Sequence, residues 1–289
     1  MRLVDVLRRL CLAALFAAGG AHAGVQVTDD RGVQRSFARP PQRIVSLLPS
    51  LTETVCVLQA CARLVGVDDY STWPAQVRAL PHVGGLEDAR VESIVALRPD
   101  LVLAPTSSRA LPRLVALGLP VVALEPRTLA DVQRVLRTLG PLLAAGDADA
   151  AWRHTAQGVD AAARSVPPAQ RGARVYVEVG SAPYAAGAAS FLGELLQRLG
   201  AANIVPAALG PFPQLNPEFV VRADPQVIVV ARGEVPALRA RPGWQRIAAV
   251  RKGRICGLTP QQDDVLMRAG PRLDEAAVLL AQCLQGRWP

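Results

Sequence analysis

The chain has 289 residues, is 51% apolar, and carries 32 Lys and Arg against 24 Asp and Glu, a formal charge of +8. This apolar content is ample for a core spread over one or two domains. The basic residues are scattered and form no run of about five or six, so we expect no nucleic acid among its partners.

Residues 1–23 have the pattern of a secretory signal peptide. A start containing Arg2 is followed by an apolar centre at residues 10–18 and by Ala21-His22-Ala23, which fits an A-x-A cleavage site. The apolar run is too short for a transmembrane helix, which needs about 20 residues. We therefore expect the chain from residue 24 onward to be soluble and exported.

Residues 24–142 alternate between apolar and amphipathic segments after a polar lead-in that contains a short hairpin. We predict strands at residues 43–48, 63–67, 100–104 and 121–124, and helices at residues 50–59, 92–98, 111–117 and 128–139. Ser50 or Thr52 is a suitable N-cap for the first helix. The alternation is typical of a parallel sheet covered by helices on both faces, and we assign it to an N-terminal lobe.

We predict one long linking helix in residues 143–168. From Asp147, a good N-cap, to Ser165 the chain is rich in alanine and lacks proline, and Pro167 and Pro168 follow. Eighteen helical residues span roughly 27 Å, about the width of a small domain. We interpret the segment as a rigid helix that joins two lobes, and an ordinary surface helix is the alternative.

Residues 169–289 restart the alternation and form a C-terminal lobe. We predict strands at residues 174–179, 201–205, 227–230 and 254–258, and helices at residues 190–199, 218–224, 243–250 and 273–284. The loop that follows the last strand carries Asp263 and Asp264, and Arg268 lies just beyond them. The fold class is therefore α/β, with two similar lobes.

A repeated pattern supports two lobes. Glu92 precedes Pro99 by seven residues, Glu218 precedes Pro225 by the same number, and each proline is followed by apolar residues that are mainly β-branched. Each copy predicts a short helix, a proline stop and a buried strand. The copies start 126 residues apart, far beyond the period of a solenoid. Each lobe therefore carries one glutamate at a matching place.

Four cysteines remain after the signal peptide, an even number that favours disulfides in an oxidising compartment. Cys56 and Cys61, close in sequence, are the first expected pair. Cys256 on a late strand and Cys283 on the last helix are the second, with free buried thiols as the alternative. The only histidines left, His82 and His154, are far from each other and from the cysteines in sequence, so we predict no metal site.

The chain carries no recognisable catalytic set, because it lacks a G-x-S-x-G elbow, a Walker loop and an H-E-x-x-H pair, and we expect no enzyme. Large aromatic residues instead follow strands or flank Gly and Pro turns: Tyr70, Trp73, Tyr184 and Phe212. Ligands of open α/β sheets bind outside the carboxyl ends of the strands. We therefore expect these residues to bind a bulky, partly apolar ligand, with Arg268 and Asp263 or Asp264 at its polar edge.

Several segments resemble one family: residues 43–53 (RIVSLLPSLTE), 64–71 (LVGVDDYS), 83–85 (VGG) and 94–102 (IVALRPDLV). They are similar to the periplasmic substrate-binding proteins of ABC importers for vitamin B12, ferric siderophores and haem, and to the B12-binding members most. The resemblance spans residues 42–285. It implies two Rossmann-like lobes joined by a single long α-helix, the class III arrangement, with little hinge motion.

The resemblance also implies function and site residues. A periplasmic, monomeric protein without a cofactor would deliver cobalamin or a related corrinoid to a membrane permease, with a ferric siderophore or haem as the alternative ligand. Glu92 and Glu218 fall where the family contacts permease arginines. Tyr70, Asp263 or Asp264, and Arg268 match residues of the B12-binding pattern. Tyr184 and Phe212 stand where that pattern has other aromatic residues. Leu86 and Pro105 replace two tryptophans of that pattern. Cys283 matches one of its cysteines, but the usual partner falls near Arg198-Leu199.

Overall fold

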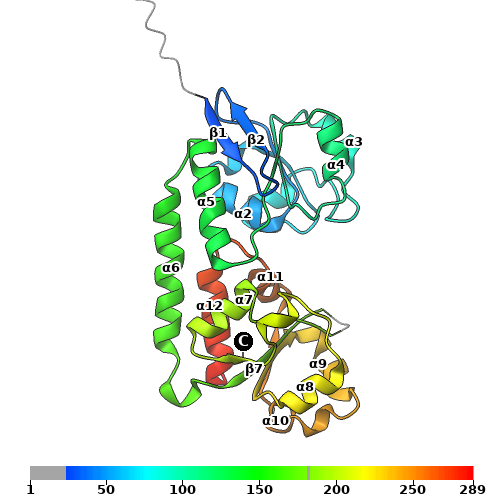
Figure 1. The fold of residues 1–289 in the computed structure, drawn as a ribbon, viewed down its shortest axis with the longest axis vertical. Helices are drawn as coiled ribbons and strands as arrows, with labels where there is room; N and C mark the ends of the chain where they lie inside the picture. The colour runs from blue at the N-terminus through cyan, green and yellow to red at the C-terminus, as the bar shows by residue number, and fades with distance from the viewer. Residues whose placement is uncertain (1–23, 181–182, 289) are drawn as a thin grey trace, which may run out of the picture.

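The computed structural model describes residues 24–180 and 183–288, which form two α/β lobes beside a long helix (Figure 1). The predicted signal peptide lies outside the described residues. Within the described ranges, no helix combines the length and the apolar composition needed to cross a membrane.

The N-terminal lobe, residues 25–143, is built on a parallel four-stranded sheet of order β4-β3-β5-β6. An antiparallel hairpin, β1 and β2, precedes it, as predicted from the polar lead-in. The strands are β1 (Val25–Thr28), β2 (Gln34–Phe37), β3 (Ile44–Ser46), β4 (Leu64–Val67), β5 (Leu101–Ala104) and β6 (Val121–Ala123). The helices are α2 (Pro49–Val57), α3 (Val91–Ala96), α4 (Leu111–Ala116) and α5 (Leu129–Leu143).

The C-terminal lobe, residues 174–285, contains a second sheet of order β11-β10-β7-β8, with β9 paired to β7. All its pairings are parallel except that of β7 with β8. The strands are β7 (Arg174–Gly180), β8 (Tyr184–Ala185), β9 (Ala202–Asn203), β10 (Val227–Ala231) and β11 (Ile255–Leu258). The helices are α7 (Phe191–Arg198), α8 (Pro217–Ala223), α9 (Val235–Ala240), α10 (Ala248–Arg251), α11 (Pro260–Leu266) and α12 (Leu273–Gln285).

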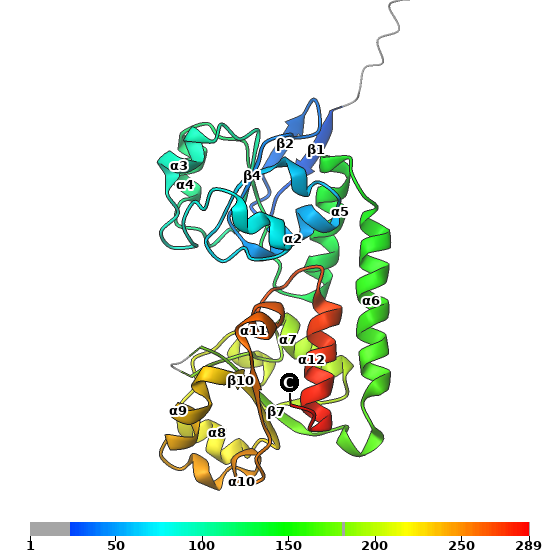
Figure 2. The same ribbon diagram turned by 180° about the vertical axis from the view of Figure 1, so that it is seen from behind.

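Helix α6 (Ala148–Ser165) runs beside both lobes (Figure 2). Asp147 caps it by accepting a hydrogen bond from the Ala150 amide at 2.9 Å, as the sequence predicts. Helix α12 packs along it. Thr155 of α6 also donates to the Pro271 carbonyl at 2.6 Å, which fixes the segment that leads into α12.

One continuous apolar core joins the two lobes. It contains Leu103 and Leu136 from the N-terminal lobe, Val159 from α6, and Leu192 and Val229 from the C-terminal lobe. Two hydrogen bonds reinforce this junction. The Phe191 amide donates to the Arg127 carbonyl at 2.8 Å. The Leu129 amide, at the start of α5, donates to the Glu194 carboxylate at 2.7 Å. Separating the lobes would expose apolar surface, which opposes large hinge motion.

Three local predictions were wrong. Helix α2 has Leu48 at its N-cap position and therefore no side-chain cap, while Ser50 and Thr52 lie inside the helix, where Thr52 donates to Ser46. Residues 243–250 divide into a short 3₁₀ turn and α10. Asp263 and Asp264 lie on helix α11, not in a loop. Thr259 caps that helix in a capping box with Gln262, and Pro260 occupies its first turn.

Both expected disulfides are present. Cys56 and Cys61 join the end of α2 to the turn that follows, with Cα atoms 4.1 Å apart. Cys256 on β11 and Cys283 on α12 are joined with Cα atoms 5.6 Å apart. The second bond ties the last helix to the C-terminal sheet.

Candidate functional site

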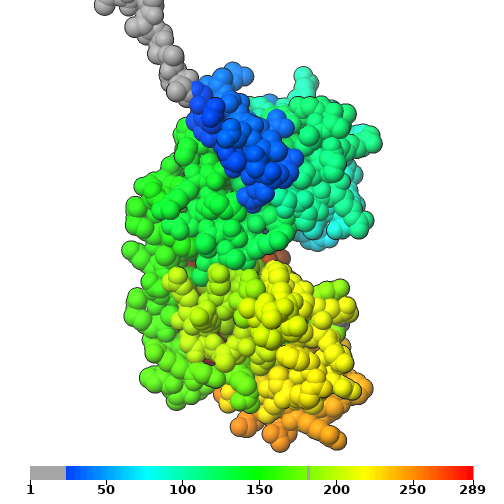
Figure 3. Space-filling view, viewed as in Figure 1, coloured from blue at the N-terminus to red at the C-terminus, as the bar shows by residue number. Residues whose placement is uncertain are grey.

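The candidate site is a cleft of about 620 Å³ between the lobes, a volume usual for small-molecule sites. The surface is hollowed between the two lobes (Figure 3). Sixteen residues line the cleft: Leu48, Pro49, Ser50, Tyr70, Leu86, Pro105, Ser107, Glu125, Pro126, Arg127, Pro211, Phe212, Asp264, Met267, Arg268 and Ala269.

The N-terminal wall of the cleft is made by the ends of the parallel strands. Leu48 follows β3, Tyr70 follows β4, Pro105 follows β5 and Glu125 follows β6. Because these strands are parallel, their carboxyl ends meet at one edge of the sheet, where open α/β sheets bind ligands. The rule that selected Tyr70 from the sequence therefore selects the whole wall.

Tyr70 and Phe212 present aromatic faces to the cleft from opposite lobes. Tyr70 is 66% exposed and Phe212 is 39% exposed. The Tyr70 ring lies directly beside the Gly85 backbone, since a Cβ on Gly85 would lie 3.0 Å from its Cε2. Phe212 packs against the buried Phe191 ring at the start of α7, with centroids 6.3 Å apart. Leu86, which stands in place of a tryptophan of the B12-binding pattern, also lines the cleft.

Glu125 and Arg127 are cleft residues that the sequence reasoning missed. The Glu125 carboxylate accepts hydrogen bonds from the Thr106 hydroxyl and from the Ser107 amide, the latter at 3.0 Å, and lies 3.5 Å from the Arg127 guanidinium. Burial would raise the pKa of Glu125, but these bonds and Arg127 together hold it below its ordinary value. Both residues directly follow β6, so the strand-end rule could have found them.

The structure separates the two candidate aspartates. Asp264 lines the cleft, and its Oδ2 accepts from the Thr72 hydroxyl at 2.9 Å. Asp263 is not among the residues that line the cleft, and its buried Oδ1 has no hydrogen-bond partner within the described part of the chain. Burial, and then the neighbouring Asp264 charge, raise the pKa of Asp263.

Arg268 borders the cleft, but its guanidinium is bonded to protein. Nη1 donates to Glu53 at 2.8 Å, and Nη2 donates to the Tyr70 carbonyl at 2.8 Å and to the Thr72 hydroxyl at 3.0 Å. Asp264 lies 2.8 Å from the same Nη2. The sequence predicted a guanidinium directed at the ligand, whereas these four acceptors all belong to the chain itself.

Two predicted aromatic contacts lie elsewhere. Trp73 does not line the cleft: the Arg272 guanidinium stacks on its ring at 4.8 Å, beside a groove at α6 and α12. Tyr184 is 43% exposed but is not among the residues that line the cleft. Its backbone forms a β-bridge with Gln214, close in the chain to Phe212.

The two repeat glutamates are exposed on different lobes. The Glu92 side chain on α3 is 79% exposed and lies 3.2 Å from Arg113, and that of Glu218 on α8 is 80% exposed and lies 3.9 Å from Arg222. Both helices lie on the side of the molecule away from α6 in both views (Figures 1 and 2). The exposed ion pairs contribute little to stability, but each glutamate lies in the first turn of its helix, where the helix dipole also favours a carboxylate.

Comparison with known proteins identifies what this arrangement is similar to. The family model described as "Periplasmic binding protein" matches residues 44–262. An uncharacterized ABC transporter substrate-binding lipoprotein of Bacillus subtilis is 29% identical over 90% of this chain and 85% of its own length. A vitamin B12-binding protein of Yersinia pestis is 30% identical over 85% of this chain and 87% of its own length.

Solved structures with this fold are named for different ligands, vitamin B12 among them. The crystal structure of a periplasmic haem-binding protein from Pseudomonas aeruginosa matches with a TM-score of 0.70 and 28% identity. The match covers 84% of this chain and 92% of that chain. The two-lobed fold is therefore shared by proteins named for different macrocycles.

Proposed function

This chain belongs to the periplasmic binding protein family, and from that premise we propose that it captures cobalamin, or a related corrinoid, for an ABC import permease. The coarser assignment follows from the family and its named relatives: the chain is a substrate-binding protein of an ABC importer and not an enzyme. The ligand, the export to the periplasm, the monomeric state and the docking residues are parts of the proposal.

The observation that carries the proposal is the pair of aromatic faces, Tyr70 and Phe212, exposed in one cleft from opposite lobes. A corrin ring is a broad and partly apolar macrocycle, and flat aromatic side chains match its faces. Its rim carries amide groups, which suit the ionised Glu125 as acceptor and Arg127 as donor. The cleft opens to solvent, so the nucleotide part of cobalamin extends outside it.

The arrangement of the lobes favours capture in a largely preformed cleft. The continuous core and the bonds between α5 and α7 hold the walls in place. A preformed cleft reduces the ordering cost of binding and so favours tight capture at low ligand concentration. The fold thus suits a protein that must collect a scarce compound.

The test is isothermal titration of the protein lacking residues 1–23 with cyanocobalamin. We expect saturable one-to-one binding in the micromolar range or tighter. Absence of heat at millimolar cyanocobalamin, together with saturable binding of a ferric hydroxamate or catecholate siderophore, would contradict the corrinoid and leave the importer assignment intact.

Haem is a second candidate ligand, because the exposed Tyr70 phenol lies in the cleft and phenolate is a known axial ligand of ferric haem. The haem-binding relative supports this candidate. Neither His82 nor His154 lines the cleft, so its lining offers the Tyr70 oxygen and the Met267 sulfur as iron ligands, and the phenolate is the better ligand for ferric iron. A corrinoid needs only the aromatic face of this residue, whereas ferric haem needs its oxygen.

The Tyr70→Phe variant separates these two ligands. If the ligand is a corrinoid, the phenyl ring keeps the contact face and affinity for cyanocobalamin changes by less than about threefold. If the ligand is haem, the variant loses the charge-transfer band of a phenolate-bound ferric iron in its absorption spectrum. Loss of cyanocobalamin binding in this variant would contradict a purely stacking role.

We also propose that Glu92 and Glu218 contact the permease. Two exposed carboxylates at matching places on two similar lobes fit a partner with matching basic sites through charge-assisted hydrogen bonds. Their present partners, Arg113 and Arg222, are exposed and could be exchanged for permease groups at little cost.

A further inference from the structure

A buried polar network joins the C-terminal segment, Arg268 to Arg272, to the N-terminal lobe. At its centre lies Glu53 of α2, whose side chain is 1% exposed. Arg268 donates to the Glu53 carboxylate at 2.8 Å and Arg272 at 3.3 Å, and Arg272 also bonds Glu275 through two nitrogens at 3.0 Å. Burial raises the pKa of Glu53, and the two guanidiniums oppose this by stabilising its charged form.

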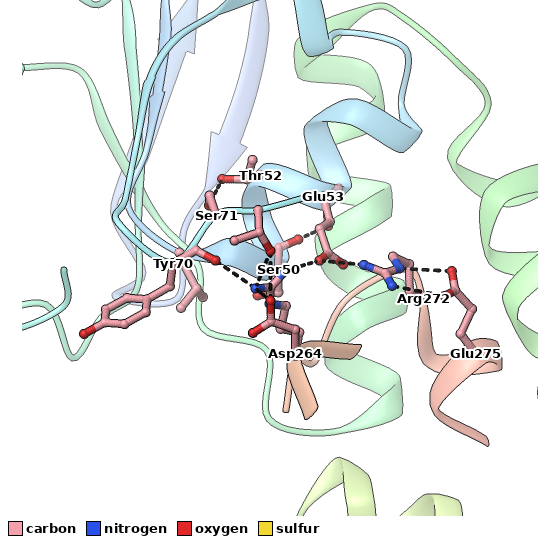
Figure 4. Close-up of polar contacts among 12 residues, drawn as sticks. Ser50, Thr52, Glu53, Tyr70, Ser71, Asp264, Arg272 and Glu275 are labelled. Atoms are coloured by element: carbon pink, nitrogen blue, oxygen red, sulfur yellow. Dashed lines mark hydrogen bonds and ion pairs between the residues drawn. The ribbon is translucent and has the colours of Figure 1, made fainter. Parts of the chain in front are cut away.

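The network holds the backbone at Tyr70 from both sides, within what we call the Tyr70 segment, residues 68–74. The Tyr70 amide donates to the buried Asp68 at 2.8 Å, and the Tyr70 carbonyl accepts from Arg268 at 2.8 Å. Ser71 donates to Thr52 at 2.8 Å. Figure 4 shows the phenol of Tyr70 turned away from the network, while its carbonyl faces it.

The contact between the two parts of the chain is close. A Cβ on Gly270 would lie 3.2 Å from the Ser50 Cβ, so the C-terminal segment passes directly over the start of α2. The Pro271 carbonyl is held by Thr155 of α6 at 2.6 Å. Arg268 is therefore anchored by a segment that is itself fixed, and it can transmit that position to Tyr70.

A buried ion pair adds little net stability, because desolvation of the two charges offsets their attraction. The ion pair instead contributes to positioning, because a planar guanidinium holds several acceptors at defined angles. The Arg268 guanidinium contacts four such acceptors, which belong to Glu53, Tyr70, Thr72 and Asp264.

We propose that Arg268 is a positioning residue that holds the Tyr70 segment in place and acts on the ligand through it, without bonding the ligand itself. The effect on binding rests on the proposed function, whereas the effect on the Tyr70 segment does not. The proposal differs from the role that resemblance gives this arginine, a direct contact with the ligand edge.

The experiment compares amide hydrogen exchange of residues 68–74 with affinity for cyanocobalamin in Arg268→Met, which keeps the length of the side chain and removes its donors. Glu53→Met/Arg268→Met is the second variant, because removing both partners avoids an unpaired buried carboxylate that could prevent folding. In both variants we expect exchange in residues 68–74 to be about tenfold faster or more, as loss of bonds from a charged donor predicts. Affinity should fall by about tenfold with it.

Arg241→Met is the matched control. Arg241 pairs with Glu178, whose side chain is also 1% exposed, but it contacts no residue of the Tyr70 segment. This variant should leave exchange in residues 68–74 and affinity within about twofold of the parent. Equal acceleration in the control would show that general destabilisation is the cause and would overturn the proposal.

Two further outcomes would also overturn the proposal. Lost affinity with unchanged exchange would show that Arg268 bonds the ligand directly, and faster exchange with unchanged affinity would show that the Tyr70 segment does not matter for binding. Either result overturns the proposal. If the parent protein binds neither cyanocobalamin nor ferric haem, the proposed function is contradicted, while the exchange rates still decide whether Arg268 positions residues 68–74.

Discussion

Tyr70 and Phe212 keep large apolar surfaces in contact with solvent, whereas Tyr176, Phe191 and Trp244 are buried. Burying an aromatic side chain of this size is favourable by about 1.5–3 kcal/mol. Folding alone therefore gives no reason to leave two of them exposed in one cleft, and a ligand that covers both does. The same reasoning does not apply to Trp73, which is already covered by Arg272.

Removing the Phe212 ring tests this explanation. Phe212→Ala should weaken cyanocobalamin binding by about 10- to 100-fold, because a buried aromatic contact of about 1.5–3 kcal/mol is lost from the complex. Titration calorimetry measures the change. The control is Leu209→Ala: Leu209 is 47% exposed and lies nearby in the chain, but it does not line the cleft. Similar losses in the two variants would mean that the cleft is not the binding site.

Of the four aromatic residues that the strand-end rule selected, Tyr70 and Phe212 line the cleft, whereas Trp73 and Tyr184 do not. Leu86 also lines the cleft, but only the family resemblance pointed to it, as the residue in place of a tryptophan. The strand-end rule could not predict the contacts of Arg268. Its main partner, Glu53, lies 215 residues away in sequence, and only the return of the chain to the other lobe brings the two together.

Elements with strong local signals agree with the sequence reading. Helix α6 was predicted from its alanine content and its Asp147 cap, and β3, β5, β7 and β10 from apolar runs. Helix α11 was missed, because Pro260 and the polar residues after it resemble a loop, and its apolar face is only Val265 and Leu266. The disulfide pairing was predicted, but only the fold shows that α12 also packs along α6 and against β10.

The two disulfides should differ in their effect on stability. Stabilisation by loop closure grows with the separation of the cysteines, which is 27 for Cys256–Cys283 and 5 for Cys56–Cys61. We expect the unfolding free energy to fall by about 3.5 kcal/mol in Cys256→Ala/Cys283→Ala and by about 2 kcal/mol in Cys56→Ala/Cys61→Ala. Urea unfolding followed by circular dichroism measures both. An equal or reversed order would show that loop closure is not the main term.

The whole molecule combines a rigid body with two separate exposed surfaces. The apolar core that runs through α5, α6 and α12 is continuous between the two lobes that form the cleft walls. The carboxylates of α3 and α8 lie away from α6 (Figures 1 and 2). A rigid body of this kind can present both glutamates to one partner at a constant spacing, which suits recognition of a partner with two similar halves.

Glu92→Ala/Glu218→Ala should therefore separate ligand capture from delivery. Both side chains are about four-fifths exposed and neither lines the cleft, so affinity for cyanocobalamin should stay within about twofold of the parent. Uptake of radiolabelled cyanocobalamin by cells that carry only the variant should fall by about tenfold or more, because two charge-assisted contacts with the permease are lost.

The control for this variant is Asp149→Ala/Asp160→Ala. These two carboxylates are also exposed and paired with arginines, but they lie on α6, and the change in net charge is the same. Uptake should be normal in the control. If the control loses uptake as well, net charge is responsible, and if the glutamate variant keeps uptake, the permease recognises another surface. A loss confined to the glutamate variant would place the permease contact on α3 and α8, because the two variants differ only in which face of the molecule loses its carboxylates.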